Sequence, residues 1–160
     1  MTASAAASKA GSQIIFDSAL ENGWGNQSWA KFDFNNTSPV HGGTKSIKIT
    51  VARGYDALSL RHAPFKGSTF AFLSFWINGG PTGGQQLRVF AVANGKPLNL
   101  NPNPLPVLNK NSWEHVVIPL SALDVTKASV IDSFWISDMS GHPSPPFFVS
   151  DITLTDDRRG

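Results

Sequence analysis

Cysteine is absent from the sequence, so disulfide bonds, thiolate catalysis and cysteine-ligated zinc are all excluded. The sequence also lacks any apolar run that approaches the length of a membrane-spanning helix. Its start, MTASAAASKAGSQ, has no long apolar stretch like that of a secretory signal peptide and is typical of an Ala/Ser linker. We expect residues 1–12 to be a flexible linker or an added tail, residues 13–156 to form one domain, and residues 157–160 to be a short tail.

Charge is also scarce. Charged residues make up 15% of the chain and the formal net charge is +2, whereas about a quarter of the residues are charged in a typical soluble protein. No cluster of Lys and Arg is longer than two residues, so the basic face that nucleic acids require is missing. The surface is therefore built largely from Asn, Ser, Thr, Gln and Gly, which suits a neutral partner and neither a nucleic acid nor a membrane.

Alternating apolar and polar residues, separated by turn signals, predict an all-β fold. The clearest case is the run from Lys45 to Val51, which places Ile47, Ile49 and Val51 on one face. No amphipathic helix of useful length is present. The natural architecture is a two-sheet antiparallel β-sandwich with jelly-roll connections, which we expect to be a monomer. The nine predicted strands are 13–16, 29–34, 45–51, 57–61, 72–77, 85–93, 113–120, 131–137 and 147–154.

Aromatic residues are abundant: five Trp, eleven Phe and one Tyr. In two predicted strands a Trp lies opposite the core-facing residues and beside serines: Trp76 in 72–77 and Trp135 in 131–137. An indole on a polar sheet face suits sugar binding, because the C–H face of a pyranose can lie on the ring while its hydroxyls reach polar side chains. The alternative is that both Trp residues are buried under loops.

Further side chains could complete such a site. Trp29 stands in a Gly/Asn-rich segment near the start of the chain and Tyr55 is expected in a loop, so both could meet ligand. Trp24 is a weaker candidate. Trp113 directly follows a turn and is expected to seal the edge of the sandwich. Arg61, Gln86, Arg88 and Asp138 offer polar groups that could bind sugar hydroxyls. The predicted ligand-binding residues are therefore Trp76, Trp135, Trp29, Tyr55, Arg61, Gln86, Arg88 and Asp138.

The order of several motifs resembles a known group of proteins. The segments that carry the resemblance are Phe16-Asp17, GGTKSIKI at 42–49, LSFWI at 73–77, SWEHVVIPL at 112–120 and VSDITL at 149–154. Together they are similar to the galactose-binding-like jelly-roll modules of secreted glycoside hydrolases, such as the family 4, 11 and 22 carbohydrate-binding modules. The Gly-rich segment GGPTGGQQ at 79–86 has no place in that resemblance.

The resemblance implies a function and a metal. Modules of this type often bind glycans along a concave sheet face, which implies that one sheet face carries both Trp76 and Trp135 and binds the ligand. It also implies a non-catalytic, secreted accessory domain of a larger enzyme that binds a cell-wall β-glucan, cellulose-like or mixed-linkage. They also often carry one structural Ca²⁺ between the first and last strands, where Asp17 and Asp151 match the acidic positions. Calcium takes six to eight oxygens, and the alternative is that both carboxylates only bind turn amides.

No pattern in the sequence indicates catalysis. Glycosidases need two carboxylates across a cleft, and no pair of the eleven acidic residues stands in a suggestive motif. The four histidines have no metal-ligand spacing, and no serine lies in a nucleophile elbow. Segment 79–84 lacks the Lys-Ser/Thr of a phosphate-binding loop and is expected to be a tight turn. Two hypotheses remain, a polysaccharide-binding module and a protein-binding or adhesive sandwich, and the aromatic sheet faces favour the first.

Overall fold

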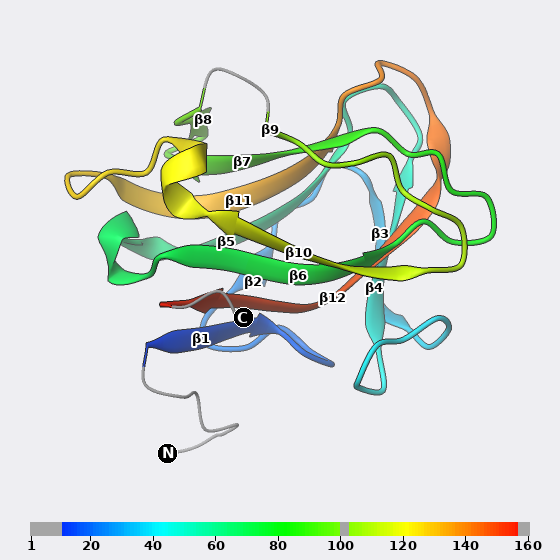
Figure 1. The fold of residues 1–160 in the computed structure, drawn as a ribbon, viewed down its shortest axis with the longest axis horizontal. Coiled ribbons are helices and arrows are strands. Elements are labelled where there is room, and N and C mark those ends of the chain that lie inside the picture. The colour runs from blue at the N-terminus through cyan, green and yellow to red at the C-terminus, as the bar shows by residue number, and fades with distance from the viewer. Residues whose placement is uncertain (1–10, 100–102, 157–160) are drawn as a thin grey trace.

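The computed structural model describes residues 11–99 and 103–156, and these form two antiparallel six-stranded sheets packed face to face (Figure 1). Sheet A comprises β1 (Ser12–Phe16), β3 (Lys31–Asn36), β4 (Ser46–Val51), β6 (Phe72–Asn78), β10 (Trp113–Pro119) and β12 (Ser144–Thr155). Sheet B comprises β2 (Gly25–Asn26), β5 (Ala57–Lys66), β7 (Leu87–Ala93), β8 (Lys96–Pro97), β9 (Asn103–Pro104) and β11 (Val130–Asp138). The predicted all-β sandwich is confirmed.

The nine predicted strands are present within about two residues of their expected ends, except that 57–61 extends to Lys66 and β12 begins at Ser144. The structure adds three two-residue strands, β2, β8 and β9, and two 3-10 turns, η1 (Gly67–Thr69) and η2 (Leu120–Leu123). No helix in the part of the chain described is long and apolar enough to cross a membrane. The predicted linker and tail fall mostly on residues 1–10 and 157–160, which lie outside the described residues.

The core lies between the two sheets and follows the predicted alternation. Ile47, Ile49 and Val51 of β4 are buried, as are Leu73 and Phe75 of β6. Sheet B contributes the inward side chains of β5, β7 and β11, which include Leu58, Leu60, Val89, Ala91, Phe134 and Ile136. Every second residue of these strands therefore points away from the core, to an outer face of the sandwich.

Trp76 and Trp135 do not share a face. Trp76 belongs to β6 of sheet A and Trp135 to β11 of sheet B, and each points away from the core. They therefore lie on opposite sides of the sandwich, and the prediction of one sheet face carrying both is wrong. The physical reason is that alternation fixes the face of a residue within its own strand, whereas the sheet to which the strand belongs depends on long-range pairing.

The register of sheet B arranges its outer face in rows. Trp135 pairs with Ser59 of β5 and with Phe90 of β7, so these three side chains form one row across the sheet. The row on one side holds Arg61, Ser133 and Val92, and the row on the other side holds Ala57, Ser137 and Arg88. Three of the predicted ligand-binding residues, Trp135, Arg61 and Arg88, are thus brought to the outer face of sheet B.

Candidate functional site

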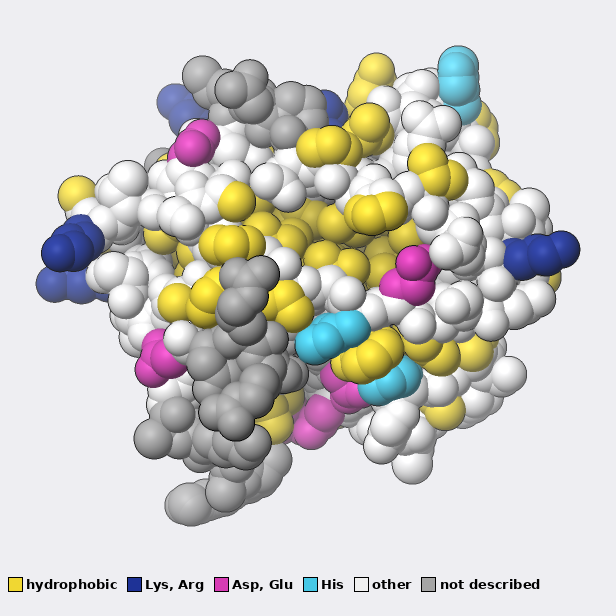
Figure 2. Space-filling model, in the orientation of Figure 1, with side chains coloured by type: hydrophobic (Ala, Val, Ile, Leu, Met, Phe, Trp, Pro, Cys, Tyr) yellow, Lys and Arg dark blue, Asp and Glu magenta, His cyan; other side chains and the backbone are white. Residues whose placement is uncertain are grey.

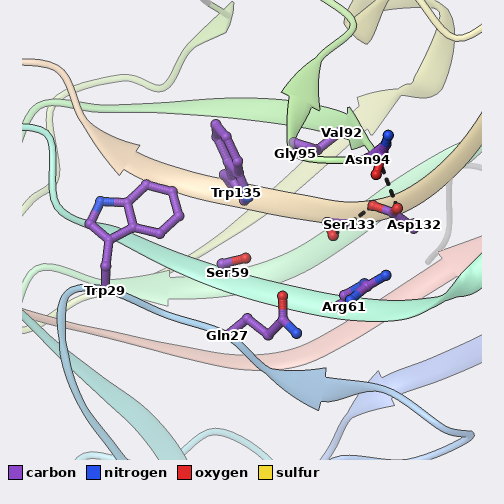
Figure 3. Close-up of a pocket in the computed structure, with 10 residues that line it drawn as sticks. All are labelled: Gln27, Trp29, Ser59, Arg61, Val92, Asn94, Gly95, Asp132, Ser133 and Trp135. Atoms are coloured by element: carbon purple, nitrogen blue, oxygen red, sulfur yellow. Dashed lines mark hydrogen bonds between the residues drawn. The ribbon is translucent and has the colours of Figure 1, made fainter.

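A groove lies on the outer face of sheet B, in a hollow of about 440 Å³. Figure 3 shows its floor between two indoles at one end and a polar cluster at the other. The strands β5 and β11 supply the floor, the segment before β3 supplies one side, and the turn between β7 and β8 supplies the far rim. The lining residues are Gln27, Trp29, Ser59, Arg61, Val92, Asn94, Gly95, Asp132, Ser133 and Trp135.

The two indoles form a rigid corner. Trp29 and Trp135 meet edge to face, with ring centroids 4.9 Å apart and an interplanar angle of 90°. The Trp29 Nε1 donates to the Tyr55 carbonyl oxygen at 3.1 Å, and Phe90 supports Trp135 from the neighbouring strand at 6.0 Å. Trp29 is nonetheless 44% exposed. The corner therefore offers a fixed aromatic surface to a single ligand chain that lies in the groove. Its right angle does not suit the flat surface of a crystalline polymer.

Small and polar side chains line the rest of the groove. Ser59 and Ser133 keep the floor low beside Trp135, and Gln27 and Arg61 stand exposed along one side. The segment that carries Gln27 is fixed to β5, because the Gln27 amide donates to the Ser59 carbonyl at 2.8 Å. Amide, hydroxyl and guanidinium groups are thus gathered around an aromatic corner, which is the set that binds sugar hydroxyls.

The carboxylate of Asp132 builds the far rim and is not free for a ligand. Its Oδ2 accepts from the Asn94 amide at 3.0 Å, and its Oδ1 accepts from the Ser133 hydroxyl at 2.9 Å. Asn94 adopts a positive φ of 52° in the turn with Gly95. Asp132 therefore holds this turn against the groove.

Tyr55 and Arg88 extend the surface beyond the aromatic corner. The Arg88 guanidinium carbon lies 5.5 Å from the Tyr55 ring centroid and 5.0 Å from that of Phe90. These distances are within the range of a cation–π contact. Tyr55 is 54% exposed and is carried at a φ of 69°. A long ligand that fills the groove can therefore continue over Tyr55.

Asp138 acts from beneath this surface, contrary to the prediction that it contacts ligand. Its side chain is fully buried, at 0% exposure. Its Oδ2 accepts from the Tyr55 and Gly141 amides at 2.9 and 3.0 Å, and its Oδ1 accepts from the Ser140 amide and hydroxyl at 3.1 and 2.7 Å. Burial raises the pKa of Asp138, but these hydrogen bonds outweigh it and hold the pKa below its ordinary value. Asp138 is thus a positioning residue for Tyr55.

Two other predicted residues lie away from the groove. Gln86 is exposed just before β7 and is not among the lining residues. Trp76, on sheet A, is held between His41 and His115, with ring centroids at 4.1 and 4.6 Å and nearly parallel planes. Both faces of the Trp76 indole are therefore already covered, and its predicted role in stacking on a sugar does not fit the structure.

Several lining residues of the groove were not predicted from the sequence. Ser59 carried a usable signal, since it alternates with the core residues Leu58 and Leu60 on the side that also bears Arg61. Gln27, Asn94 and Asp132 carried no such signal, because turns and long-range pairing bring them to the groove.

The predicted calcium ligands lie at neighbouring places, because Phe16 of β1 pairs with Ile152 of β12. Asp17 accepts from the Ser18 amide at 2.6 Å, and Asp151 pairs with His41 at 2.6 Å. The hydrogen bond with Asp17, the negative charge of Asp17 and burial raise the pKa of Glu21. No three His, Cys, Asp or Glu side chains form a metal-binding group within residues 11–99 and 103–156. The side chains alone do not complete a calcium shell.

Calcium binding by Asp17 and Asp151 therefore stays a prediction. An ion bound only by the folded chain stabilises it by mass action, so a chelator is expected to lower the melting temperature if these residues share calcium. The measurement is a thermal melt with and without EDTA, together with elemental analysis. An unchanged melt with no metal detected would leave only the hydrogen bonds described above for these carboxylates.

Comparisons with known proteins bear on the fold. No protein-family model matches the chain. A protein of Dictyostelium discoideum named endoglucanase is 32% identical over 148 residues, which cover 88% of this chain and 21% of that protein. The chain thus spans about a fifth of the length of this relative.

Solved structures of family 29 carbohydrate-binding modules superpose over most of the chain. One such module complexed with mannohexaose has a TM-score of 0.62 at 14% identity and covers 91% of both chains. Another, complexed with cellulohexaose, has a TM-score of 0.61 at 15% identity and covers 91% of this chain and 90% of that one. This chain has the fold of a carbohydrate-binding module. The predicted resemblance is confirmed at the level of the fold, whereas the particular families 4, 11 and 22 stay a prediction.

Proposed function

We propose that the chain is a non-catalytic module that binds a neutral polysaccharide in the groove on the outer face of sheet B. The observation that carries the proposal is the fixed corner of Trp29 and Trp135 beside a low floor of serines and a rim of amides. Aromatic faces bind the apolar C–H face of a sugar, and the polar rim binds its hydroxyls. The carbohydrate-binding modules with this fold support the same proposal.

The surface favours a ligand without charge. The one carboxylate in the groove lining, Asp132, is hydrogen-bonded through both oxygens. On the face of the molecule in Figure 2, Lys and Arg side chains are few and lie at the margins. The formal net charge of the chain is only +2, which is too small to favour a highly charged polymer.

The ligand class we propose is a β-linked glucan, cellulose-like or mixed-linkage, bound as a single chain. The right angle between the two indoles excludes a flat platform, and a groove suits a chain that is separated from its neighbours. Two further facts support this class: the relative from Dictyostelium is named an endoglucanase, and modules with this fold are complexed with cellulohexaose and mannohexaose. We also propose that the module is part of a larger secreted enzyme.

The groove lacks the groups for glycoside hydrolysis. Hydrolysis requires an acid and a second carboxylate on either side of the scissile bond. Of the ten lining side chains in Figure 3, only Asp132 is acidic, and it is engaged in holding the rim. The proposed module therefore binds the chain and leaves its bonds intact.

Binding without hydrolysis is directly measurable. We expect the purified protein to sediment with amorphous cellulose and to migrate slowly in native gels that contain soluble β-glucan. Binding should change little between low and high salt, because a neutral ligand carries no charge whose attraction salt could screen. No reducing sugar should be released during long incubation.

Two results would contradict this proposal. Failure to bind any polysaccharide in a panel of cellulose, mixed-linkage glucan, mannan, xylan and chitin would favour a protein-binding sandwich instead. Steady release of reducing sugar that a single Asp or Glu substitution abolishes would show catalysis.

A further inference from the structure

A second pocket, of about 430 Å³, lies on the outer face of sheet A. Register places Trp113 of β10, Asn78 of β6 and Phe148 of β12 in one row across that sheet. Residues outside the strands complete the lining of the pocket: Ser38, Pro39, Gly80, Pro81 and Asn111. The pocket therefore faces away from the groove on sheet B, with the hydrophobic core between them.

The walls of this pocket are fixed by the Gly-rich segment that the groove does not use. The Asn111 amide donates to the Gly80 carbonyl at 2.8 Å, and the Gly84 amide donates to the Leu108 carbonyl at 2.8 Å. A Cβ at Gly79 would overlap the carbonyl oxygen of Asn109, so only glycine permits this close approach.

A buried amide ties the same segment to β12. The Gln85 side chain is 1% exposed, and its Nε2 donates to the Gly79 and Pro146 carbonyls, each at 2.9 Å. Segment 79–85 is thus held from two sides, by the 108–111 turn and by the start of β12. The pocket is formed before any ligand arrives, which lowers the entropy cost of binding.

The pocket shares indole, amide and hydroxyl groups with the groove, but has no counterpart of Arg61 and Asp132. None of its lining residues is charged; they combine an indole with amide, hydroxyl and apolar groups. Asn111 is exposed, Trp113 is half-buried, and both line the pocket, so these are the polar and aromatic side chains that it offers to a ligand. Trp113 lies beside His41, at 5.6 Å between ring centroids, but is not covered face to face as Trp76 is.

We propose that this pocket is a second glycan-binding site, which takes a neutral oligosaccharide segment with Trp113 as the stacking ring. The proposal rests on the proposed function, in that both sites bind the same class of chain. Since the outer faces of sheets A and B point in opposite directions, the module binds two chains at once. A single module therefore crosslinks a soluble β-glucan.

Calorimetric titration with cellohexaose tests the number of sites. We expect two equivalents to bind the parent protein and one to bind Trp113→Ala, whose pocket should lose at least tenfold in affinity. Trp113→Phe, which keeps an aromatic ring, should retain partial binding at the second site. Asn111→Gly keeps the left-handed turn at φ 53° and removes only the side chain. It should weaken the second site even if Trp113→Ala fails to fold.

The outcomes separate this inference from the proposed function. One equivalent for the parent, lost in Trp135→Ala and kept in Trp113→Ala, would overturn the second site and leave the groove intact. One equivalent lost only in Trp113→Ala would overturn both the groove and the two-chain binding. No binding at all would overturn both proposals.

Crosslinking gives an independent readout. Mixed-linkage β-glucan should become turbid or more viscous when the parent protein is added. The effect should be smaller at large protein excess, because each module is then bound to only one glucan chain and forms no crosslink. Trp113→Ala should bind the polymer without raising its viscosity. Equal viscosity with the parent and with Trp113→Ala would contradict crosslinking through this pocket.

Discussion

Trp135→Ala is expected to weaken the binding of cellohexaose in the groove by about tenfold or more, and the double variant Trp29→Ala with Trp135→Ala by more than this, with about a hundredfold as the value for additive effects. Aromatic contacts contribute about 1–2 kcal/mol each, and 1.4 kcal/mol corresponds to tenfold in affinity. The two rings touch each other at 4.9 Å, so their effects need not add. The measurement is calorimetric titration of each variant.

A matched control separates stacking from a general loss of aromatic surface. Phe32 is 53% exposed on the edge strand β3 of sheet A and lines neither pocket. Phe32→Ala should therefore bind like the parent. The three variants should also keep the far-ultraviolet circular dichroism of the parent. A folded Trp135→Ala variant that binds with parental affinity would place the ligand elsewhere.

Asp138→Asn is expected to lower the free energy of unfolding by about 2–4 kcal/mol. The substitution keeps the shape of the side chain but replaces one acceptor oxygen by a donor. Because both oxygens accept from N–H or O–H groups of Tyr55, Ser140 and Gly141, one of these donors loses its partner in a fully buried place. Urea unfolding at neutral pH measures the change, and a loss below about 0.5 kcal/mol would contradict this role.

Acid should reveal the same contact. The folded pKa of Asp138 lies below its ordinary value, so the carboxylate stabilises the fold above that ordinary value, and this contribution is lost as the pH falls through the folded pKa. The free energy of unfolding of the parent should therefore fall more steeply in acid than that of Asp138→Asn, and the two free energies should converge at low pH. If the two free energies of unfolding stay equally far apart down to strong acid, Asp138 does not titrate as described.

Periodicity predicted much of the fold because it is a local property. Alternation in β4, β6 and β11 correctly separated core-facing Ile47, Phe75 and Phe134 from outward-facing neighbours. It also placed Trp135 outward, where the groove lies. It could not say that Trp76 belongs to the other sheet, since the pairing of β6 with β10 and β12 is set by residues far apart in the chain.

The turns of the chain limited how much of the site could be predicted from the sequence. Trp29, Tyr55, Arg61 and Arg88 were predicted from residue type. Strand register brings the two arginines close to Trp135, and loop hydrogen bonds bring Trp29 and Tyr55 there. The prediction that Asp138 contacts ligand was wrong because the sequence around a carboxylate at the end of a strand looks the same in two cases. The carboxylate can face a ligand, or it can accept hydrogen bonds from the amides of a turn, as Asp138 does. The Gly-rich segment at 79–86 could be assigned a place only when the close approach of Gly79 to Asn109 was seen.

The most direct test of the account follows individual residues during titration of ¹⁵N-labelled protein with cellohexaose. The account predicts saturable shifts of the Trp29 and Trp135 indole signals and of the Gln27, Ser59 and Asn94 amides, which line one groove on the outer face of sheet B. Shifts at Trp113 are expected as well if the second site is occupied. Saturable binding that leaves the signals of Trp29, Trp135 and Ser59 unmoved would contradict the central claim.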